Sequence, residues 1–156
     1  MNRGIFAIAT LFVLLVLASC EAPPVFEENK PIVDAKWNET QPVQFEFDVQ
    51  DTVRLHNFYI NVRNGENYAY SNLYLFVEME FPNGKLAIDT LSCPLADATG
   101  KWYGSGLGDI YDNRILYRER KQFPLAGHYR VAIYQAMRTE NLEGIYDVGF
   151  RLSTAN

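Results

Sequence analysis

The sequence contains little of the chemistry that metal sites and disulfide frameworks require. It has two cysteines, Cys20 and Cys93, and two histidines, His56 and His128. Neither histidine has a second imidazole or a cysteine at a ligand spacing, so no zinc or copper site is indicated. If Cys20 is modified, Cys93 has no partner, and we expect it to be buried as a small apolar group. We therefore predict neither a metal nor a cofactor.

The motifs of several enzyme classes are also missing. The segment 104–108, GSGLG, repeats glycine at every second position. The dinucleotide fingerprint, the P-loop and the serine-hydrolase elbow each require a different glycine spacing and a helix after the loop, and no helical periodicity follows here. The formal net charge of −5 argues against nonspecific binding to nucleic acid. The sequence predicts no catalytic residues and no enzyme activity.

The amino-terminal segment gives a cellular address. Ile5 to Leu17 is apolar apart from Thr10, and it is shorter than the roughly 20 residues that a bilayer-spanning helix needs. Leu17-Ala18-Ser19-Cys20 follows directly and has the form of a lipobox. We therefore predict that residues 1–19 are a cleaved lipoprotein signal peptide and that Cys20 is acylated, which would hold the protein on a membrane.

The rest of the chain divides into a tether and one β domain. Residues 20–31 are rich in proline and glutamate and are predicted to form a lipidated tether. Residues 32–156 have the length of one domain and alternate apolar with polar residues. Seven or eight short strands predict an antiparallel β-sandwich, of which the jelly roll is one form. The expected strands are 43–49, 53–63, 73–81, 86–92, 114–120, 128–137 and 145–152.

One of these strands has a break in its pattern. Val53 and Leu55 are out of phase with Phe58 and the apolar residues after it. A single inserted residue would restore the alternation, because side chains in a strand change face at every step. We therefore expect a β-bulge near His56 and Asn57.

Two other segments have local signals. Residues 81–85, FPNGK, are typical of a tight hairpin turn, because Asn and Gly tolerate a positive φ. Residues 114–120 carry several arginines. Positive charge discourages pairing with other chains, so we expect an edge strand there, with a contact to an acidic partner as the alternative.

The stretch 97–117 interrupts the strand pattern with four glycines among large aromatic residues. Four of its side chains are candidate contacts with a partner protein or a glycan: Trp102, Tyr103, Asp109 and Tyr111. Aromatic rings can stack on sugars or pack in protein interfaces. The alternative for Trp102 is that it covers the open end of the sandwich core.

Three aspartates in the same region leave a question open. Asp97, Asp109 and Asp112 could gather around calcium or provide a pair of catalytic carboxylates. Their spacing lacks the register of a calcium-binding loop, and aspartate is also a common turn-capping residue. The sequence does not decide between a calcium site and three turn caps.

Several segments together carry a resemblance to a known family: Tyr70–Leu75, Leu95–Asp97, Gly100–Asp109, Ala136–Arg138 and Tyr146–Gly149. Over about residues 25–152 and the lipobox, the chain resembles the gliding motility lipoprotein GldH family of Bacteroidetes. The resemblance implies an envelope lipoprotein required for gliding, with other gliding motility and type IX secretion envelope proteins as partners. It gives a defined role only to Cys20 and implies no established enzymatic activity.

Two further expectations complete the prediction. Residues 21–24 lack an acidic run directly after Cys20, so we expect a lipid-anchored position in the outer membrane, facing the periplasm. The alternative function is a glycan-binding β-sandwich module displayed on the membrane, which would use Trp102 for binding.

Overall fold

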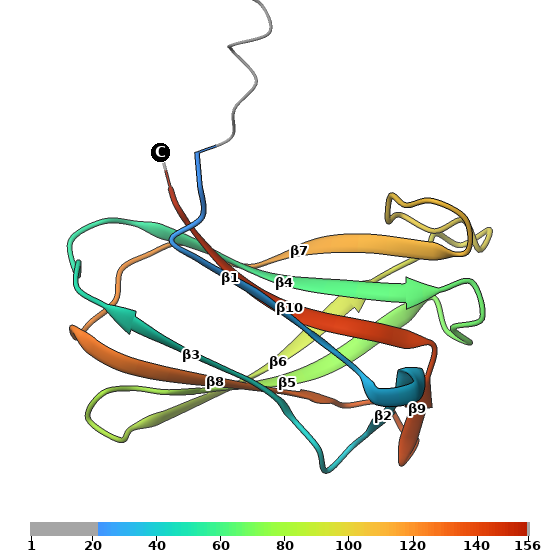
Figure 1. Cartoon of the computed structure of the whole chain (residues 1–156), viewed down its shortest axis with the longest axis horizontal. Coiled ribbons are helices and arrows are strands. Elements are labelled where there is room, and N and C mark those ends of the chain that lie inside the picture. Colours follow the sequence, from blue (N-terminus) through green and yellow to red (C-terminus); the bar gives the residue numbers. More distant parts are fainter. Residues whose placement is uncertain (1–21, 156) are drawn as a thin grey trace, which may run out of the picture.

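The computed structural model describes residues 22–155, which form an all-β domain of two packed sheets (Figure 1). We call β1-β10-β4-β7 the upper sheet and β3-β8-β5-β6 the lower sheet, as they lie in Figure 1. A two-stranded ribbon of β2 and β9 lies at one end. The elements are β1 (Phe26–Pro31), the 3₁₀ turn η1 (Val33–Ala35), β2 (Lys36–Asn38), β3 (Val43–Val49), β4 (His56–Gly65), β5 (Asn72–Glu80), β6 (Leu86–Pro94), β7 (Ile110–Lys121), β8 (Gly127–Gln135), β9 (Asn141–Glu143) and β10 (Ile145–Thr154).

The order of the strands defines the topology. When the short β2 and β9 are set aside, the first, eighth, third and sixth strands form the upper sheet. The second, seventh, fourth and fifth form the lower sheet, so the chain crosses from one sheet to the other at every step except the β5–β6 hairpin, which stays within the lower sheet. This is the jelly-roll arrangement, and its strand pairs are antiparallel. The predicted antiparallel β-sandwich of jelly-roll form is confirmed.

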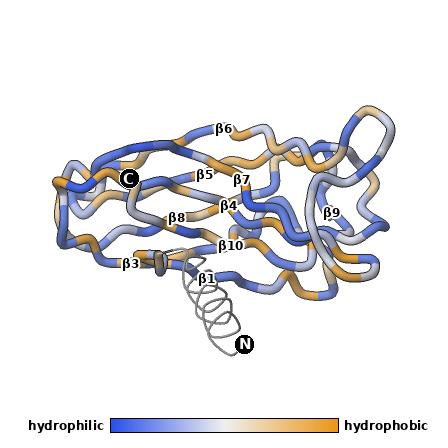
Figure 2. Tube along the Cα trace, turned by 90° about the horizontal axis from the view of Figure 1, so that it is seen from above, coloured by the Kyte–Doolittle hydropathy of each residue, from blue (hydrophilic) through white to orange (hydrophobic). Residues whose placement is uncertain are grey.

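The core lies between the sheets and follows the predicted alternation. Along β3, every second residue from Val43 to Val49 is buried and the residues between are exposed. The same alternation is visible as changes of hydropathy along the strands in Figure 2. At the end away from β2 and β9, aromatic rings fill the core. Phe47 stacks on Tyr129 with ring centroids 5.8 Å apart, and Phe123 lies 5.0 Å from Tyr129 in an edge contact.

Side chains close both long sides of the sandwich. On one side, Asp89 of β6 accepts hydrogen bonds from Tyr117 and Arg118 of β7. The Tyr117 hydrogen bond contributes most to lowering the pKa of Asp89, and burial raises the pKa of Tyr117. On the other side, Lys30 Nζ of β1 donates to the Gln44 carbonyl of β3 at 2.6 Å. Each sheet edge is therefore tied to the edge beneath it.

The predicted tether is wrong over residues 26–31, which form the edge strand β1. This strand pairs with β10, with Phe26 opposite Leu152 and Pro31 opposite Asp147. Phe26 faces inward, and its ring centroid lies 5.2 Å from that of Phe47. Apolar contact and backbone pairing with a distant segment outweigh the local polar composition. A tether can therefore extend only to residue 25.

The second predicted strand begins later than expected. Val53 is 78 % exposed and lies in a turn where the Asp51 carboxylate accepts hydrogen bonds from Val53 N and Arg54 N. The irregularity near His56 is present in the pairing with β7. Between the pairs His56–Lys121 and Phe58–Arg118, β7 has two residues where β4 has one, so the additional residue belongs to β7, where Arg120 has a φ of 50°. The strand β7 is at the sheet edge, as predicted.

The remaining strand predictions mostly hold. The 81–85 turn is closed by a 2.8 Å hydrogen bond from Gly84 N to Phe81 O, and Gly84 has a φ of 76°. In a regular strand Tyr146 would share the inward face of Val148, but an irregular pairing between Ile145 and Asp147 turns it outward, and it is 38 % exposed. The structure also contains β2 and β9, which the sequence pattern did not reveal.

Cys93 is fully buried, as predicted, and burial raises the pKa of its thiol to about 12. The predicted signal peptide, residues 1–19, and Cys20 lie outside the described residues. Across residues 22–155, the structure contains no helix with the length and apolar character needed to cross a bilayer.

Candidate functional site

The glycine-rich loop (residues 95–109) links β6 of the lower sheet to β7 of the upper sheet at one end of the sandwich (Figure 1). Backbone hydrogen bonds hold it at several points. Tyr103 N donates to Leu95 O at 2.9 Å, and Ser105 and Asp112 exchange both of their backbone hydrogen bonds, at 3.1 and 2.7 Å. The loop is therefore an ordered extension of the sheets.

Asp97 caps the first turn of this loop. Its Oδ1 accepts hydrogen bonds from Thr99 Oγ1 at 2.7 Å, Thr99 N at 2.8 Å and Lys101 N at 3.0 Å. These bonds, that of the Thr99 hydroxyl foremost, lower the pKa of Asp97. The carboxylate has the turn-capping role that was one of the two alternatives for it.

The three aspartates do not come together. Asp112 Oδ1 lies 2.6 Å from Arg63 Nε, and Asp109 is exposed at the tip of the loop. Within residues 22–155 there is no group of three or more acidic, histidine or cysteine side chains placed to hold a metal ion. The arrangement that a calcium site at Asp97, Asp109 and Asp112 would require is therefore not formed.

Two of the four candidate contact residues support the loop from inside. The Trp102 ring lies between those of Tyr111 and Tyr68, with centroid distances of 5.6 and 6.3 Å. Trp102 also packs against the hydrophobic core and is only partly exposed, as is Tyr111. Trp102 thus covers the end of the core. The glycan-binding alternative, which needs a free aromatic face, would rest on Tyr103.

The other two candidates point outward. Tyr103 is 63 % exposed, and Asp109 is exposed near it in the sequence. Between them Leu107 is 96 % exposed, which is unusual for a large aliphatic side chain held in an ordered loop. Sequence reasoning did not select Leu107. Its position between two glycines was the available signal, because glycine neighbours offer it nothing to pack against.

The glycines explain why Leu107 is held at the tip. A Cβ on Gly106 would lie 1.9 Å from the Ile110 carbonyl oxygen, so only glycine allows the two segments to approach this closely. Gly108 has a φ of 70°, a conformation that other residues adopt at a cost. The glycines therefore fold the chain tightly back on itself and leave Leu107 projecting.

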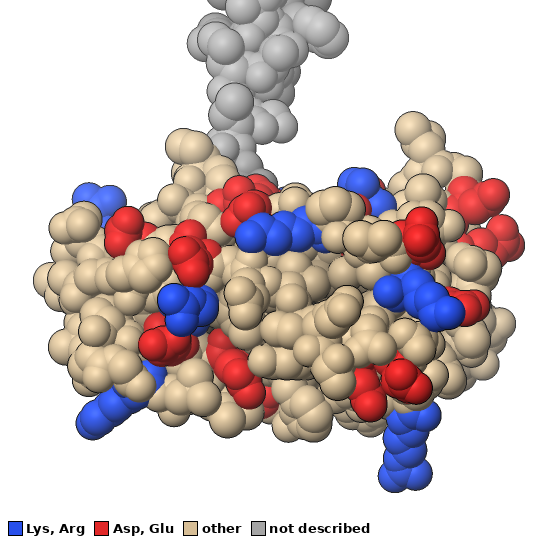
Figure 3. Space-filling view, turned by 60° about the horizontal axis from the view of Figure 1, so that its bottom comes forward, with Lys and Arg blue, Asp and Glu red and all other residues tan. Residues whose placement is uncertain are grey.

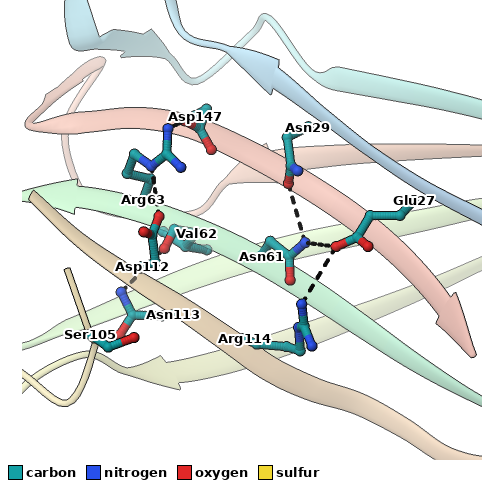
Figure 4. Close-up of a pocket in the computed structure, with 10 residues that line it drawn as sticks. All are labelled: Glu27, Asn29, Asn61, Val62, Arg63, Ser105, Asp112, Asn113, Arg114 and Asp147. Carbon is teal, nitrogen blue, oxygen red and sulfur yellow. Dashed lines mark hydrogen bonds and ion pairs between the residues drawn. The ribbon is translucent and has the colours of Figure 1, made fainter. Parts of the chain in front are cut away.

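A polar hollow lies beside the loop on the outer face of the upper sheet (Figure 4). Its volume is about 380 Å³, and Ser105 of the loop forms part of its wall. Gly149 of β10 is paired with Asn29 of β1 and with Asn61 of β4, and both asparagines line the hollow. A Cβ on Gly149 would lie 1.8 Å from Asn29 Oδ1, so only glycine at this position leaves room for the Asn29 side chain.

The charges in the hollow are paired with one another. Arg63 lies 2.6 Å from Asp112 and 3.1 Å from Asp147. Glu27 lies 3.6 Å from Arg114 and also binds Arg151. Burial raises the pKa of Asp147, and Arg63 partly opposes this effect.

Asparagine side chains add hydrogen bonds between the strands. Asn61 Nδ2 donates to Glu27 Oε1 at 3.1 Å and to Asn29 Oδ1 at 3.2 Å.

Each of the three carboxylates in the hollow, those of Glu27, Asp112 and Asp147, has an arginine partner. The hollow can offer hydrogen bonds to a polar group, and its own ion pairs would compete with an ionic ligand.

These features define a jelly-roll domain with a self-paired polar hollow and an ordered loop that presents an exposed apolar side chain. The family model described as GldH lipoprotein matches residues 24–152. The chain belongs to the GldH lipoprotein family.

Two curated relatives cover nearly the whole chain. A protein named gliding motility lipoprotein GldH homolog, from Christiangramia forsetii, is 37 % identical over 94 % of this chain and 93 % of its own length. The gliding motility lipoprotein GldH of Flavobacterium johnsoniae is 37 % identical over 97 % of this chain and 95 % of its own length.

A solved structure has a similar fold. It is a family GH115 4-O-methyl-α-glucuronidase with specificity for decorated arabinogalactans, and it matches 88 % of this chain with a TM-score of 0.50 and 11 % identity. The chain corresponds to only 18 % of that enzyme. The likeness therefore concerns the fold of one part of the enzyme.

Proposed function

We propose that this protein is a noncatalytic envelope lipoprotein that works in gliding motility by binding other proteins of the gliding machinery and the type IX secretion system. The family and the names of the two relatives support the process. The observation that carries the contact role is the loop tip, where Leu107 is 96 % and Tyr103 63 % exposed on a segment fixed by backbone hydrogen bonds. Exposed apolar and aromatic groups on a rigid support are typical of protein interfaces.

The chemistry of the site supports a noncatalytic role. The carboxylates of the hollow are engaged in ion pairs, and Asp97 is engaged in a turn cap. Cys93, whose thiol could otherwise act as a nucleophile, is buried, and its raised pKa keeps it protonated at neutral pH. The described residues thus present surfaces for contact more clearly than groups for a reaction.

Anchoring through acylated Cys20 places the domain close to the membrane in this proposal. Since β1 begins at Phe26, five residues separate Cys20 from the upper sheet, and the six Cα–Cα steps from Cys20 to Phe26 span at most about 20 Å. The proposed position is the periplasmic side of the outer membrane, where the domain can reach membrane-embedded partners from its short tether.

Deletion of the gene in its own bacterium tests the proposed function. We expect colonies that no longer spread and a culture fluid depleted of secreted proteins, with both restored by the wild-type gene. A C20A copy should restore neither, because a protein without the lipid anchor is no longer held at the membrane. The total amount of each variant in the cells, measured by immunoblot, provides the control. Normal spreading together with normal secretion in the deletion strain would refute the proposal.

A further inference from the structure

The outer face of the lower sheet carries an apolar patch that the proposed function does not use. We define the apolar patch as Tyr74, Phe76, Ile88, Tyr134 and Met137. Phe76 of β5 lies directly opposite Tyr134 of β8, and Ile88 comes from the neighbouring β6. Phe76 is 45 % and Ile88 59 % exposed. Exposure of apolar side chains to water is unfavourable in free energy, so contact with another apolar surface would stabilise them. The patch borders a shallow hollow of about 510 Å³.

Two glutamates line the same hollow, Glu39 and Glu78. Glu78 lies opposite Ile88 in the strand register. In the described part of the chain, neither carboxylate is within ion-pair distance of a basic side chain. The patch is therefore bordered by negative charge that the domain itself does not neutralise.

Other acidic groups on the same face differ in this respect. Arg130 lies 3.0 Å from Glu46 and 2.7 Å from Glu80. Glu80 is two residues after Glu78 on β5. His128 lies near Asp48 and Glu46 as well. Figure 3 shows this lower side, where uncharged surface separates groups of acidic and basic residues. The uncompensated charge thus coincides with the apolar patch.

The patch also faces away from the point where the chain enters the domain. Val25 N donates to Leu152 O of β10, so the chain enters along the upper sheet (Figure 1). A lipid at Cys20 would bring the membrane to that side. The lower face is then free to meet a protein, and its negative charge does not suit a bilayer with anionic headgroups.

We propose that the apolar patch, bordered by Glu39 and Glu78, is a docking surface for a partner protein that presents apolar side chains flanked by lysine or arginine. Apolar contact would supply the affinity, and the two carboxylates would select for positive charge. A second copy of this chain fits less well, because facing patches would bring the same glutamates together. This surface is separate from the loop tip and does not depend on the identity of the partner bound there.

The test uses the full lipidated protein in detergent micelles, with methyl groups of Ile88 and Met137 labelled for NMR. The probe is a synthetic peptide that alternates leucine and lysine, and its counterpart alternates leucine and glutamate. We expect the lysine peptide to shift both methyl signals and the glutamate peptide to leave them unchanged. The E39Q/E78Q variant should bind the lysine peptide about fivefold more weakly, because two exposed charge contacts are lost.

The matched control is E119Q/E143Q, which removes two exposed glutamates that lie elsewhere, on β7 and β9. It should bind the lysine peptide as the wild type does, and F76S should abolish the methyl shifts in a protein that still unfolds cooperatively. Unshifted methyl signals, or equal binding by E39Q/E78Q, would overturn the proposal. A dimer detected by light scattering and lost in F76S would show instead that the patch binds a second copy of the chain. Methyl shifts of equal size caused by an oligosaccharide or by anionic vesicles would show that it binds a glycan or a membrane.

Discussion

The two outer faces of this sandwich are built by the same alternation of residues but differ in how their charges are paired. On the upper sheet, arginines pair with each carboxylate of the polar hollow, and Gly149 leaves room for an asparagine side chain to join them. On the lower sheet, Arg130 neutralises one group of acids, while Glu39 and Glu78 remain beside exposed apolar groups. Alternation therefore determines which residues face water, and ion pairing distinguishes a closed face from one available to a partner.

The largest expected effect is a loss of stability, and it is compared between two variants that each remove one glutamate, one from each face. Glu27 on the upper face binds Arg151, whose side chain is only 5 % exposed. Loss of a buried ion-pair partner is costly, so E27A should lower the free energy of unfolding by about 3 kcal/mol. Glu46 on the lower face pairs with Arg130 where both side chains are about half exposed, and E46A should cost far less than E27A because water screens an exposed ion pair.

Urea unfolding of both variants at neutral pH gives the two free energies. Equal losses for E27A and E46A would mean that the upper face is not held together by its ion pairs. The distinction between the two faces would then be incorrect.

The second prediction concerns the loop that joins the two faces. Trp102 packs between Tyr68 and Tyr111 against the core. Because this side chain is partly buried, W102A should lower the free energy of unfolding by about 2 kcal/mol, less than a fully buried tryptophan would. Y103A, at the neighbouring exposed position, should remain within about 0.5 kcal/mol of the wild type. Thermal unfolding followed by circular dichroism measures both losses. A larger loss for Y103A than for W102A would mean that Tyr103 supports the loop and that Trp102 is the contact residue.

A smaller, pH-dependent effect is expected where the two sheets meet at β6 and β7. The hydrogen bond from Tyr117, together with Arg118, lowers the pKa of Asp89 below its unfolded value. The ionised carboxylate therefore stabilises the fold above the unfolded pKa of about 4, and this stabilisation is lost as the pH falls through the folded pKa. The difference in unfolding free energy between wild type and D89N should be constant near neutral pH and shrink in acid. A difference that grows in acid would show that Asp89 does not have this role.

The strands that the sequence predicted have strong alternation, as in residues 43–49. The strand β1 was missed because its stability comes from pairing with β10, far along the chain, and this pairing leaves no local pattern in its mostly polar sequence. The start of β4 was placed too early because Val53 has strand propensity, although the Asp51 cap turns the chain there. Non-local pairing and side-chain capping are decided by tertiary contacts.

The candidate site was predicted in part. Composition pointed to the correct loop, since glycines among aromatic residues are rarely used in an ordinary hairpin. It gave the core-covering alternative to Trp102 and not to Tyr103, but it could not decide between that role and an exposed contact, because residues of an irregular loop have no fixed period. The polar hollow is assembled from four strands distant in the sequence, and no single stretch of residues indicates it.

Colony spreading of cells whose only copy of the gene encodes Y103A/L107A tests the central claim most directly. Val53, equally aliphatic and 78 % exposed in a turn between β3 and β4, provides the V53A control. If the protein acts through contacts at the loop tip, Y103A/L107A cells fail to spread while the purified variant unfolds at the same urea concentration as the wild type, and V53A cells spread normally. Normal spreading of Y103A/L107A cells would contradict this account.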